Sequence, residues 1–176
     1  MSKTGLFFGP EEGAVHRIAK KIEELAGPEN IDMIPVANAR KEDLEKYQKI
    51  IFGISTVGRE TWNQDFLNTD WSGFFPEFDH VSFEGKTIAI FGLGDHVTYP
   101  SHFVDAMGQL VRAIRKNSPG TKIVGQTSTE GYEFVDSEAV VDGRFTGLPL
   151  DEDFEPELTS QRVSDWVKMI SPDFGF

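Results

Sequence analysis

The sequence predicts a doubly wound α/β domain, in which a five-stranded parallel sheet carries helices on both faces. Short apolar segments alternate with amphipathic segments along the chain, which is the pattern of βαβ units. The length of 176 residues fits one domain, 1–176, with a single sizeable core. The longest tight apolar run, 88–91, is far shorter than the ~20 residues that a membrane-spanning helix needs.

Five strands are expected, separated by helix or turn signals. They are 5–8, 31–36, 49–54, 87–91 and 122–126. Residues 50–52 are apolar at every position, as in a central parallel strand that is buried on both faces. We therefore expect this segment in the interior of the sheet.

Three helices are expected from apolar residues at helical spacing. The first covers 12–26 and ends at Gly27-Pro28, and the second carries apolar positions from 103 to 114. The last carries apolar positions from 163 to 170, with Thr159 or Ser160 as its expected N-cap. In the first helix the apolar positions are Val15, Ile18, Ala19, Ile22 and Leu25. A loop-rich segment, 128–157, separates the fifth strand from the last helix.

The composition narrows the possible functions. The net charge is −12, from 29 acidic and 17 basic residues, and this disfavours nucleic acid because phosphate binding rests on Lys and Arg. The negative net charge either favours binding to basic protein partners or serves only to keep the protein soluble. The chain has no cysteine, which excludes disulfides, iron–sulfur ligation and thiol catalysis. No apolar signal segment follows Met1, so we expect a cytoplasmic protein that does not enter a membrane.

The predicted fold also predicts where a ligand binds. In a doubly wound sheet, ligands bind outside the carboxyl ends of the strands, where the strand order reverses. The loops at that edge are 9–15, 55–70 and 92–101.

These loops and their flanks resemble those of the long-chain flavodoxins. The similar blocks, in order, are 5–9, 91–95 with Tyr99, 128–134 and 147–153, within a similarity that runs from Lys3 to Ile170. The last two blocks resemble the insertion that splits the fifth strand of this group. The resemblance implies a flavodoxin-like fold, non-covalently bound FMN and one-electron transfer without substrate turnover. It also implies a monomer that meets basic redox partner proteins transiently.

The resemblance assigns roles to residues of the second and third loops. Tyr99 matches the tyrosine that stacks on the outer face of the flavin, and a flat electron-rich ring suits that position. Leu93, Gly94 and Asp95 match the stretch whose backbone contacts the pyrimidine end of the flavin. Thr56, after Ser55, matches a threonine near the ribityl chain.

The resemblance also assigns roles to the three residues after Thr56, of which Val57 takes the position at the inner face of the flavin. Val57 replaces the tryptophan of many members, as in the variants that serve nitrogen fixation, and Trp62 is the alternative cover for this face. Gly58 would let its peptide turn over on flavin reduction, because glycine adopts positive φ at little cost. Arg59 would favour the anionic reduced flavin, so Arg59→Ala is expected to lower the midpoint potential of the second electron.

The first loop departs from the family pattern. Family members wrap the FMN phosphate with a Thr/Ser-x-Thr-Gly-x-Thr stretch. The matching residues here are Pro10, Glu11, Glu12, Gly13, Ala14 and Val15, of which only the glycine agrees. Three lost hydroxyl hydrogen bonds remove roughly 4–9 kcal/mol. A carboxylate ~5 Å from the phosphate adds roughly 1–3 kcal/mol of repulsion.

This loop leaves several ligands open. Either glutamate can satisfy the amide groups at the start of the first helix in place of a phosphate, or both are ordinary first-turn residues. The protein then holds FMN weakly, binds riboflavin or another phosphate-free flavin, or is a flavin-free module for protein interaction.

Two other sets of polar residues suggest no chemistry. The four histidines, His16, His80, His96 and His102, lack a zinc spacing and are expected at the surface. The carboxylates of 151–157 lack the alternating EF-hand pattern, so we expect a solvated acidic loop and no metal site.

Overall fold

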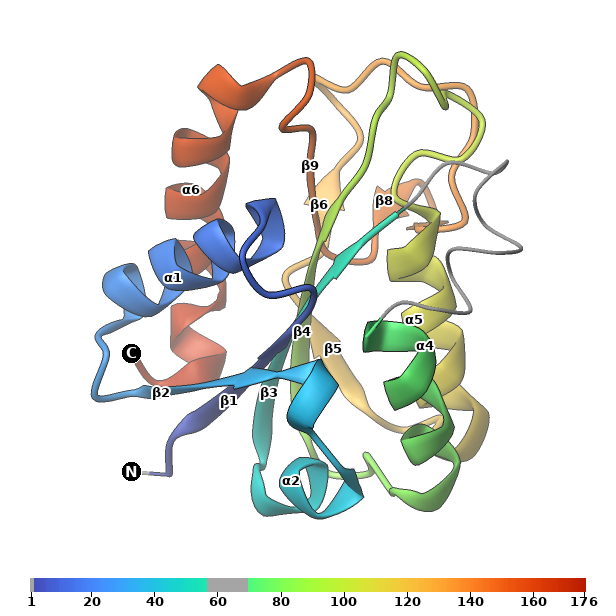
Figure 1. The fold of residues 1–176 in the computed structure, drawn as a ribbon. Helices are drawn as coiled ribbons and strands as arrows, with labels where there is room; N and C mark the ends of the chain where they lie inside the picture. Colours follow the sequence, from blue (N-terminus) through green and yellow to red (C-terminus); the bar gives the residue numbers. More distant parts are fainter. Residues whose placement is uncertain (1, 57–69) are drawn as a thin grey trace.

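The computed structural model describes residues 2–56 and 70–176, and it contains the predicted parallel sheet (Figure 1). The strand order is β2-β1-β3-β4-β5, as in flavodoxin-like folds. The strands are β1 Thr4–Phe8, β2 Ile31–Pro35, β3 Lys49–Ser55, β4 Thr87–Leu93 and β5 Lys122–Val124. The central segment 50–52 is fully buried, as expected.

The strand order reverses between β1 and β3. The chain goes from β1 to the edge strand β2 and then returns to β3 on the other side of β1. The carboxyl ends of β1 and β3 lie side by side, with Phe8 opposite Gly53. A switch of this kind leaves a crevice between the loops that follow the two strands.

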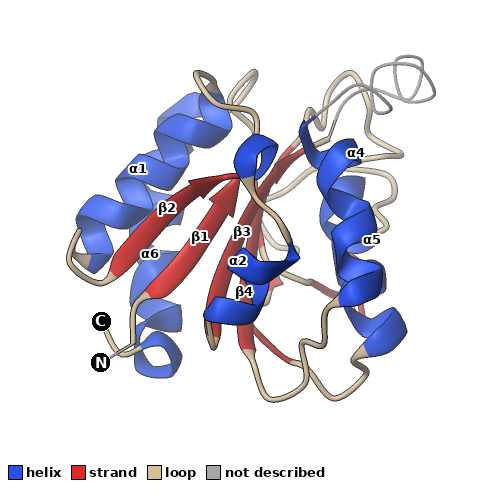
Figure 2. Cartoon of the chain, turned by 60° about the horizontal axis from the view of Figure 1, so that its bottom comes forward, coloured by secondary structure: helices blue, strands red, loops and turns tan. Residues whose placement is uncertain are grey.

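Helices cover both faces of the sheet (Figure 2). One face carries α1 (Ala14–Ala26) and α6 (Pro156–Phe174), and the other carries α4 (Asp70–Phe74) and α5 (Asp105–Asn117). Three further short elements are α2 (Lys41–Lys46) and the 3₁₀ helices Val36–Asn38 and Phe75–His80. These short helices were not predicted, because three to six residues are too few to show a helical period.

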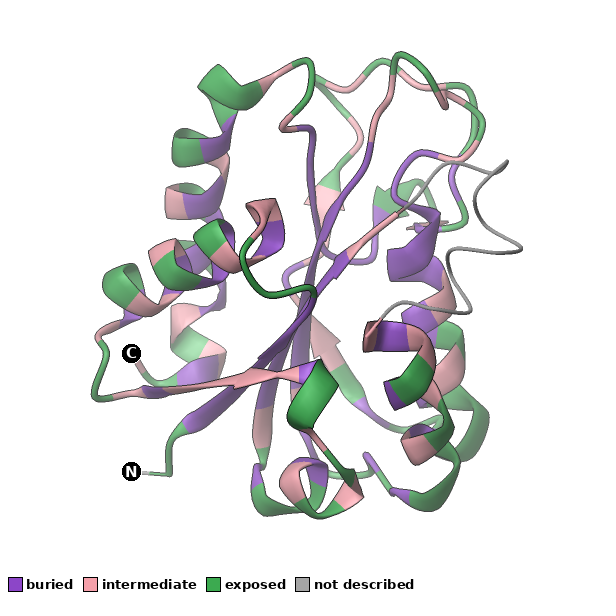
Figure 3. Cartoon of the chain, in the orientation of Figure 1, coloured by how far each residue is buried: buried purple, intermediate pink, exposed green. Residues whose placement is uncertain are grey.

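The buried apolar residues form two layers, one on each side of the sheet. Figure 3 shows the buried positions concentrated along the central strands of the sheet. β4 alternates between them: Ile88 and Ile90 belong to the layer under α5, whereas Ala89 and Phe91 belong to the layer under α1 and α6. The expected core position Leu25 is instead 46 % exposed, and Ala26 is buried in its place.

The fifth position of the sheet is occupied by two segments. β5 pairs with the start of β4, and β9 (Leu148–Leu150) pairs with its end. Between them lies a three-stranded antiparallel sheet of β6 (Thr127–Ser128), β7 (Val140–Val141) and β8 (Arg144–Phe145), in the order β6-β8-β7. This confirms the predicted insertion in the fifth strand.

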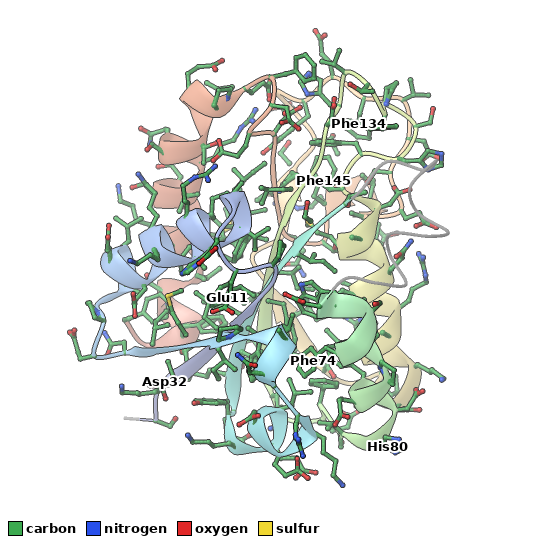
Figure 4. All side chains as sticks on the ribbon, in the orientation of Figure 1. Glu11, Asp32, Phe74, His80, Phe134 and Phe145 are labelled. Atoms are coloured by element: carbon green, nitrogen blue, oxygen red, sulfur yellow. The ribbon has the colours of Figure 1, made fainter. Side chains whose placement is uncertain are left out.

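Aromatic side chains attach the insertion to the segment before α5. The ring of Phe103 lies 5.8 Å from those of Tyr132 and Phe134 and 5.9 Å from that of Phe145, between centroids. Figure 4 shows Phe134 and Phe145 together in the upper right of the molecule.

Over 2–56 and 70–176, no helix has the length and apolar character required to cross a membrane.

Candidate functional site

The described residues directly after β1, β3 and β4 lie together at the carboxyl edge of the sheet. Backbone hydrogen bonds join the strand ends there. The Gly9 N–H donates to the Gly53 carbonyl (3.4 Å) and the Thr56 N–H to the Leu93 carbonyl (2.8 Å). The Gly94 N–H donates to the Leu150 carbonyl of β9 (3.0 Å). Ser55, at the end of β3, pairs with Leu93 at the end of β4. The first residues of the second predicted loop, Ser55 and Thr56, therefore lie beside the start of the third.

The first loop presents an exposed turn before α1. Pro10, Glu11 and Glu12 are exposed, and Figure 4 shows Glu11 at the connection between β1 and α1. Gly13 is the N-cap residue, and Val15 is buried. Positive φ (61°) falls on Glu12, and its backbone N–H donates to His16 Nδ1 at 3.1 Å.

The two glutamates do not cap α1. The helix has no side-chain cap at its start and no acidic residue in its first turn, so the hypothesis that Glu11 or Glu12 replaces the phosphate there is wrong. The first bond of the helix runs from the Arg17 N–H to the Gly13 carbonyl (3.1 Å). The amides of residues 14–16 therefore have no acceptor within the helix, as at any helix start.

A small cavity with basic side chains lies beside this turn. Its volume is about 240 Å³, and the residues around it are Glu12, Gly13, His16, Arg17 and Lys20. Arg17 and Lys20 were not among the predicted site residues, whose only charged members in this loop were the two carboxylates. The signal was available: residues 13, 16, 17 and 20 have the spacing of one helix face.

Thr56 is held by the start of α5. Its Oγ1 accepts a hydrogen bond from the Ala106 N–H at 3.0 Å, so the hydroxyl supplies the cap that the helix lacks locally. The hydroxyl proton remains available to an acceptor in the site.

The loop after β4 is ordered by Asp95. The Asp95 Oδ1 accepts from the Val97 N–H (3.0 Å) and the Thr98 N–H (2.7 Å), and the Tyr99 N–H donates to the Asp95 carbonyl (3.2 Å). The Asp95 carboxylate is therefore used inside its own loop. The Tyr99 ring is half-buried, and among the described residues it has no aromatic partner.

A buried carboxylate fastens this loop to the end of β9. Asp151 has no exposed surface and accepts hydrogen bonds from the backbone N–H groups of His96 (3.1 Å), Asp153 (3.0 Å) and Phe154 (2.8 Å). It also contacts His96 Nδ1. Burial acts to raise the pKa of Asp151, but these hydrogen bonds outweigh it and the pKa is lowered.

Two predictions are thereby wrong. Asp151 is not part of a solvated loop, and the His96 side chain is only 12 % exposed, so it is not a surface histidine. Their pairing joins residues 55 positions apart in the chain, which no local spacing reveals. The candidates Val57, Gly58 and Arg59, and the alternative Trp62, lie outside the described residues.

Comparisons with known proteins agree with this geometry. The sequence profile of the family described as Flavodoxin matches residues 6–166. A flavodoxin from Synechococcus elongatus is 42 % identical over 176 residues, 99 % of this chain and 99 % of that protein. Flavodoxin 1 from Escherichia coli is 40 % identical over 174 residues, 98 % of this chain and 95 % of that protein.

A solved structure gives the same result. The crystal structure of Fusobacterium nucleatum flavodoxin bound to flavin mononucleotide superposes with a TM-score of 0.85 at 26 % identity, covering 99 % of both chains. The split fifth strand, the order of the sheet and the full-length similarity lead to one conclusion: this chain belongs to the flavodoxin family, close to its long-chain members.

Proposed function

We propose that this protein is a one-electron carrier that holds FMN non-covalently at the carboxyl edge of the sheet. The observation that carries the proposal is that the described residues directly after β1, β3 and β4 lie together at the strand-order switch, in a chain that matches a flavodoxin over 99 % of its length. The bound FMN would supply the redox chemistry. The residues described here would bind and orient it, and no substrate turnover is involved.

The start of α1 fits a phosphate despite the missing hydroxyls. The amides of residues 14–16 are not used by the helix, and the helix dipole adds to their attraction for an anion. A Cβ added at Gly13 would meet no atom within 4 Å, so there is open space beside these amides. Arg17 and Lys20 line the adjoining cavity and offset the charges of Glu11 and Glu12.

The loop 94–99 would hold the ring of the flavin. Tyr99 is the candidate for stacking, and the backbone of residues 93–95 is the candidate for contact with the pyrimidine end. Asp151 and Asp95 hold this loop in one conformation before the ligand arrives, which reduces the entropy lost on binding. Ser55 and Thr56 would border the ribityl chain.

In this proposal the protein is a cytoplasmic monomer of one domain. Its partners are basic redox proteins, which it binds transiently. The net charge of −12 supports them, since a negative surface steers encounter with a positive one. The same charge opposes binding to nucleic acid.

Parallel titration of the apoprotein with FMN and riboflavin tests the ligand. We expect FMN to bind at least about tenfold more tightly, because charged hydrogen bonds contribute about 1.5–3 kcal/mol each. Equal affinities would point to a phosphate-free flavin as the ligand. If neither flavin bound, the protein would instead be a flavin-free module for protein interaction.

The variant Arg17→Gln tests the phosphate end separately. We expect it to weaken FMN binding several-fold and to leave riboflavin binding unchanged, because only FMN carries the anion near this side chain. Lys168→Gln, which removes the same charge from an exposed position on α6, is the control and should change neither affinity.

A further inference from the structure

A second and larger cavity lies away from the proposed flavin site, between α5, β5 and the strands of the insertion. Its volume is about 780 Å³, within the range of sites for drug-sized ligands. Figure 1 shows α5 and β8 on the same side of the molecule, to the right of the sheet. The apolar residues around the cavity include Val111, Ile123 and Val141.

The cavity gathers positive charge on an acidic protein. Of the ten residues around it, four are basic (Arg112, Arg115, Lys116 and Arg144) and one, Asp142, is acidic. Over the whole chain, by contrast, 29 acidic residues outnumber 17 basic ones. The local excess of cations is therefore opposite in sign to the overall charge.

Two of the four cations have no carboxylate partner among the described residues. Arg144 donates to the Gln126 carbonyl (2.9 Å) and Arg115 to the Pro119 carbonyl (2.8 Å), so each guanidinium is positioned by a neutral group and keeps its charge unpaired. The other two form exposed ion pairs, Arg112 with Glu138 and Lys116 with Asp79. Exposed pairs of this kind contribute little and give way readily to a better anion.

An unpartnered hydroxyl lies at the same cavity. Thr146 is only 7 % exposed, and its Oγ1 is the one buried side-chain polar atom in the described part of the chain without a hydrogen-bond partner. Its backbone N–H is used in a bond to the Ala139 carbonyl (2.9 Å), but the hydroxyl is not used. Buried polar atoms are nearly always hydrogen-bonded, so an orphan hydroxyl beside a cavity indicates a missing acceptor.

We propose that this cavity is a second ligand site, which binds a small organic molecule with one carboxylate and an apolar body. The unpaired guanidinium groups of Arg115 and Arg144 suit one carboxylate, since arginine binds that group in a fork geometry. The Thr146 hydroxyl donates a further hydrogen bond, and Val111, Ile123 and Val141 contact the apolar body. The site does not depend on the flavin, because none of its residues belongs to the loops after β1, β3 or β4.

The test compares 2-naphthylacetate with its neutral amide, 2-naphthylacetamide, on the full chain as purified. Calorimetry gives the affinities, and amide chemical shifts locate the binding. We expect the carboxylate to bind about tenfold more tightly than the amide, with shifts confined to residues around 111–116, 123–126 and 141–146. The proposal would be overturned by equal affinities for the two compounds, by shifts at other residues, or by no binding of either compound. It would also be overturned if the cavity bound an acidic peptide but neither small molecule.

Three variants assign the contacts. Arg144→Gln and Arg115→Gln should each weaken the carboxylate at least several-fold and leave the amide unchanged, whereas Lys168→Gln on α6, which faces the other side of the sheet, should alter neither. Thr146→Val keeps the shape of the side chain and removes the hydroxyl. It should weaken the carboxylate without lowering the unfolding temperature, because the hydroxyl has no partner to lose. Full affinity in all three variants would rule out this mode of binding.

Discussion

At the scale of single residues, two buried aspartates hold the loops of the site. Asp151 accepts hydrogen bonds from three backbone N–H groups. Asp105 accepts a hydrogen bond from the Glu138 N–H (2.8 Å) and contacts His102 Nδ1 (2.9 Å). Burial raises the pKa of Asp105 more than these bonds lower it, whereas the pKa of Asp151 is lowered. The two carboxylates therefore affect stability in opposite directions as the pH falls.

The variant Asp151→Asn tests the anchoring carboxylate. Because its folded pKa lies below the ordinary value of 3.8, ionised Asp151 stabilises the fold above about pH 4, and this contribution is lost as the pH falls through the lowered pKa. We expect the variant to lose about 1–3 kcal/mol at pH 7, and the difference to shrink at acid pH. Urea unfolding at several pH values measures it. Asp153→Asn, at an exposed position, is the control.

The variant Tyr99→Ala tests the stacking residue. Aromatic pairs contribute about 0.5–1.5 kcal/mol, so we expect FMN to bind roughly 2- to 12-fold more weakly. Tyr99→Phe keeps the ring and should bind FMN nearly as the parent does. Fluorescence titration of the apoprotein measures both, and parent-like affinity in Tyr99→Ala would show that this ring does not cover the flavin.

At the scale of elements, the insertion and α5 form one unit. The Ser137 hydroxyl donates to the Phe103 carbonyl, and the Asp105 carboxylate accepts from the Glu138 N–H. The two backbones approach each other at Gly108, where an added Cβ would lie 2.1 Å from the Glu138 carbonyl oxygen. Since Thr56 caps the same helix, the insertion supports the loops of the site through α5.

The variant Gly108→Ala tests this packing. A methyl group there must displace the backbone of the insertion, so we expect a loss of about 1–3 kcal/mol, even though alanine favours helix. Gly73→Ala in α4 makes the same chemical change where a Cβ meets nothing within 4 Å, and it should be neutral or stabilising. Unfolding curves of the two variants give the comparison. Equal changes in the free energy of unfolding in the two variants would mean that the backbone of the insertion moves away from residue 108 at no cost.

At the scale of the whole molecule, we expect the net charge to control how fast the protein meets a charged redox partner. With a net charge of −12, the protein should reduce a cationic haem protein faster at low ionic strength and progressively more slowly as salt screens the attraction. With ferricyanide, an anion, the salt dependence should have the opposite sign. Stopped-flow rates over a salt series measure both, and the same sign for both acceptors would exclude steering by net charge.

Much of the fold follows from local patterns. The five strands and the long helices were predicted because alternation of apolar segments and helical spacing are local properties, and the burial of 50–52 follows from their unbroken apolar character. The three loops at the carboxyl edge follow from the fold class alone. The roles of Tyr99, Asp95 and Thr56 required the family resemblance and remain predictions.

Contacts between distant residues required the tertiary structure. The pairing of His96 with Asp151, the cap from Thr56 to α5 and the basic cavity beside Thr146 each join segments that only folding brings together. The first loop shows the same distinction. Its residue types revealed the absent hydroxyls, whereas the uncapped start of α1 and the cations beside it, which support the proposed phosphate site, became visible only in the tertiary structure. Sequence periodicity sets which side chains are buried, whereas the environment of a polar group depends on neighbours that are remote along the chain.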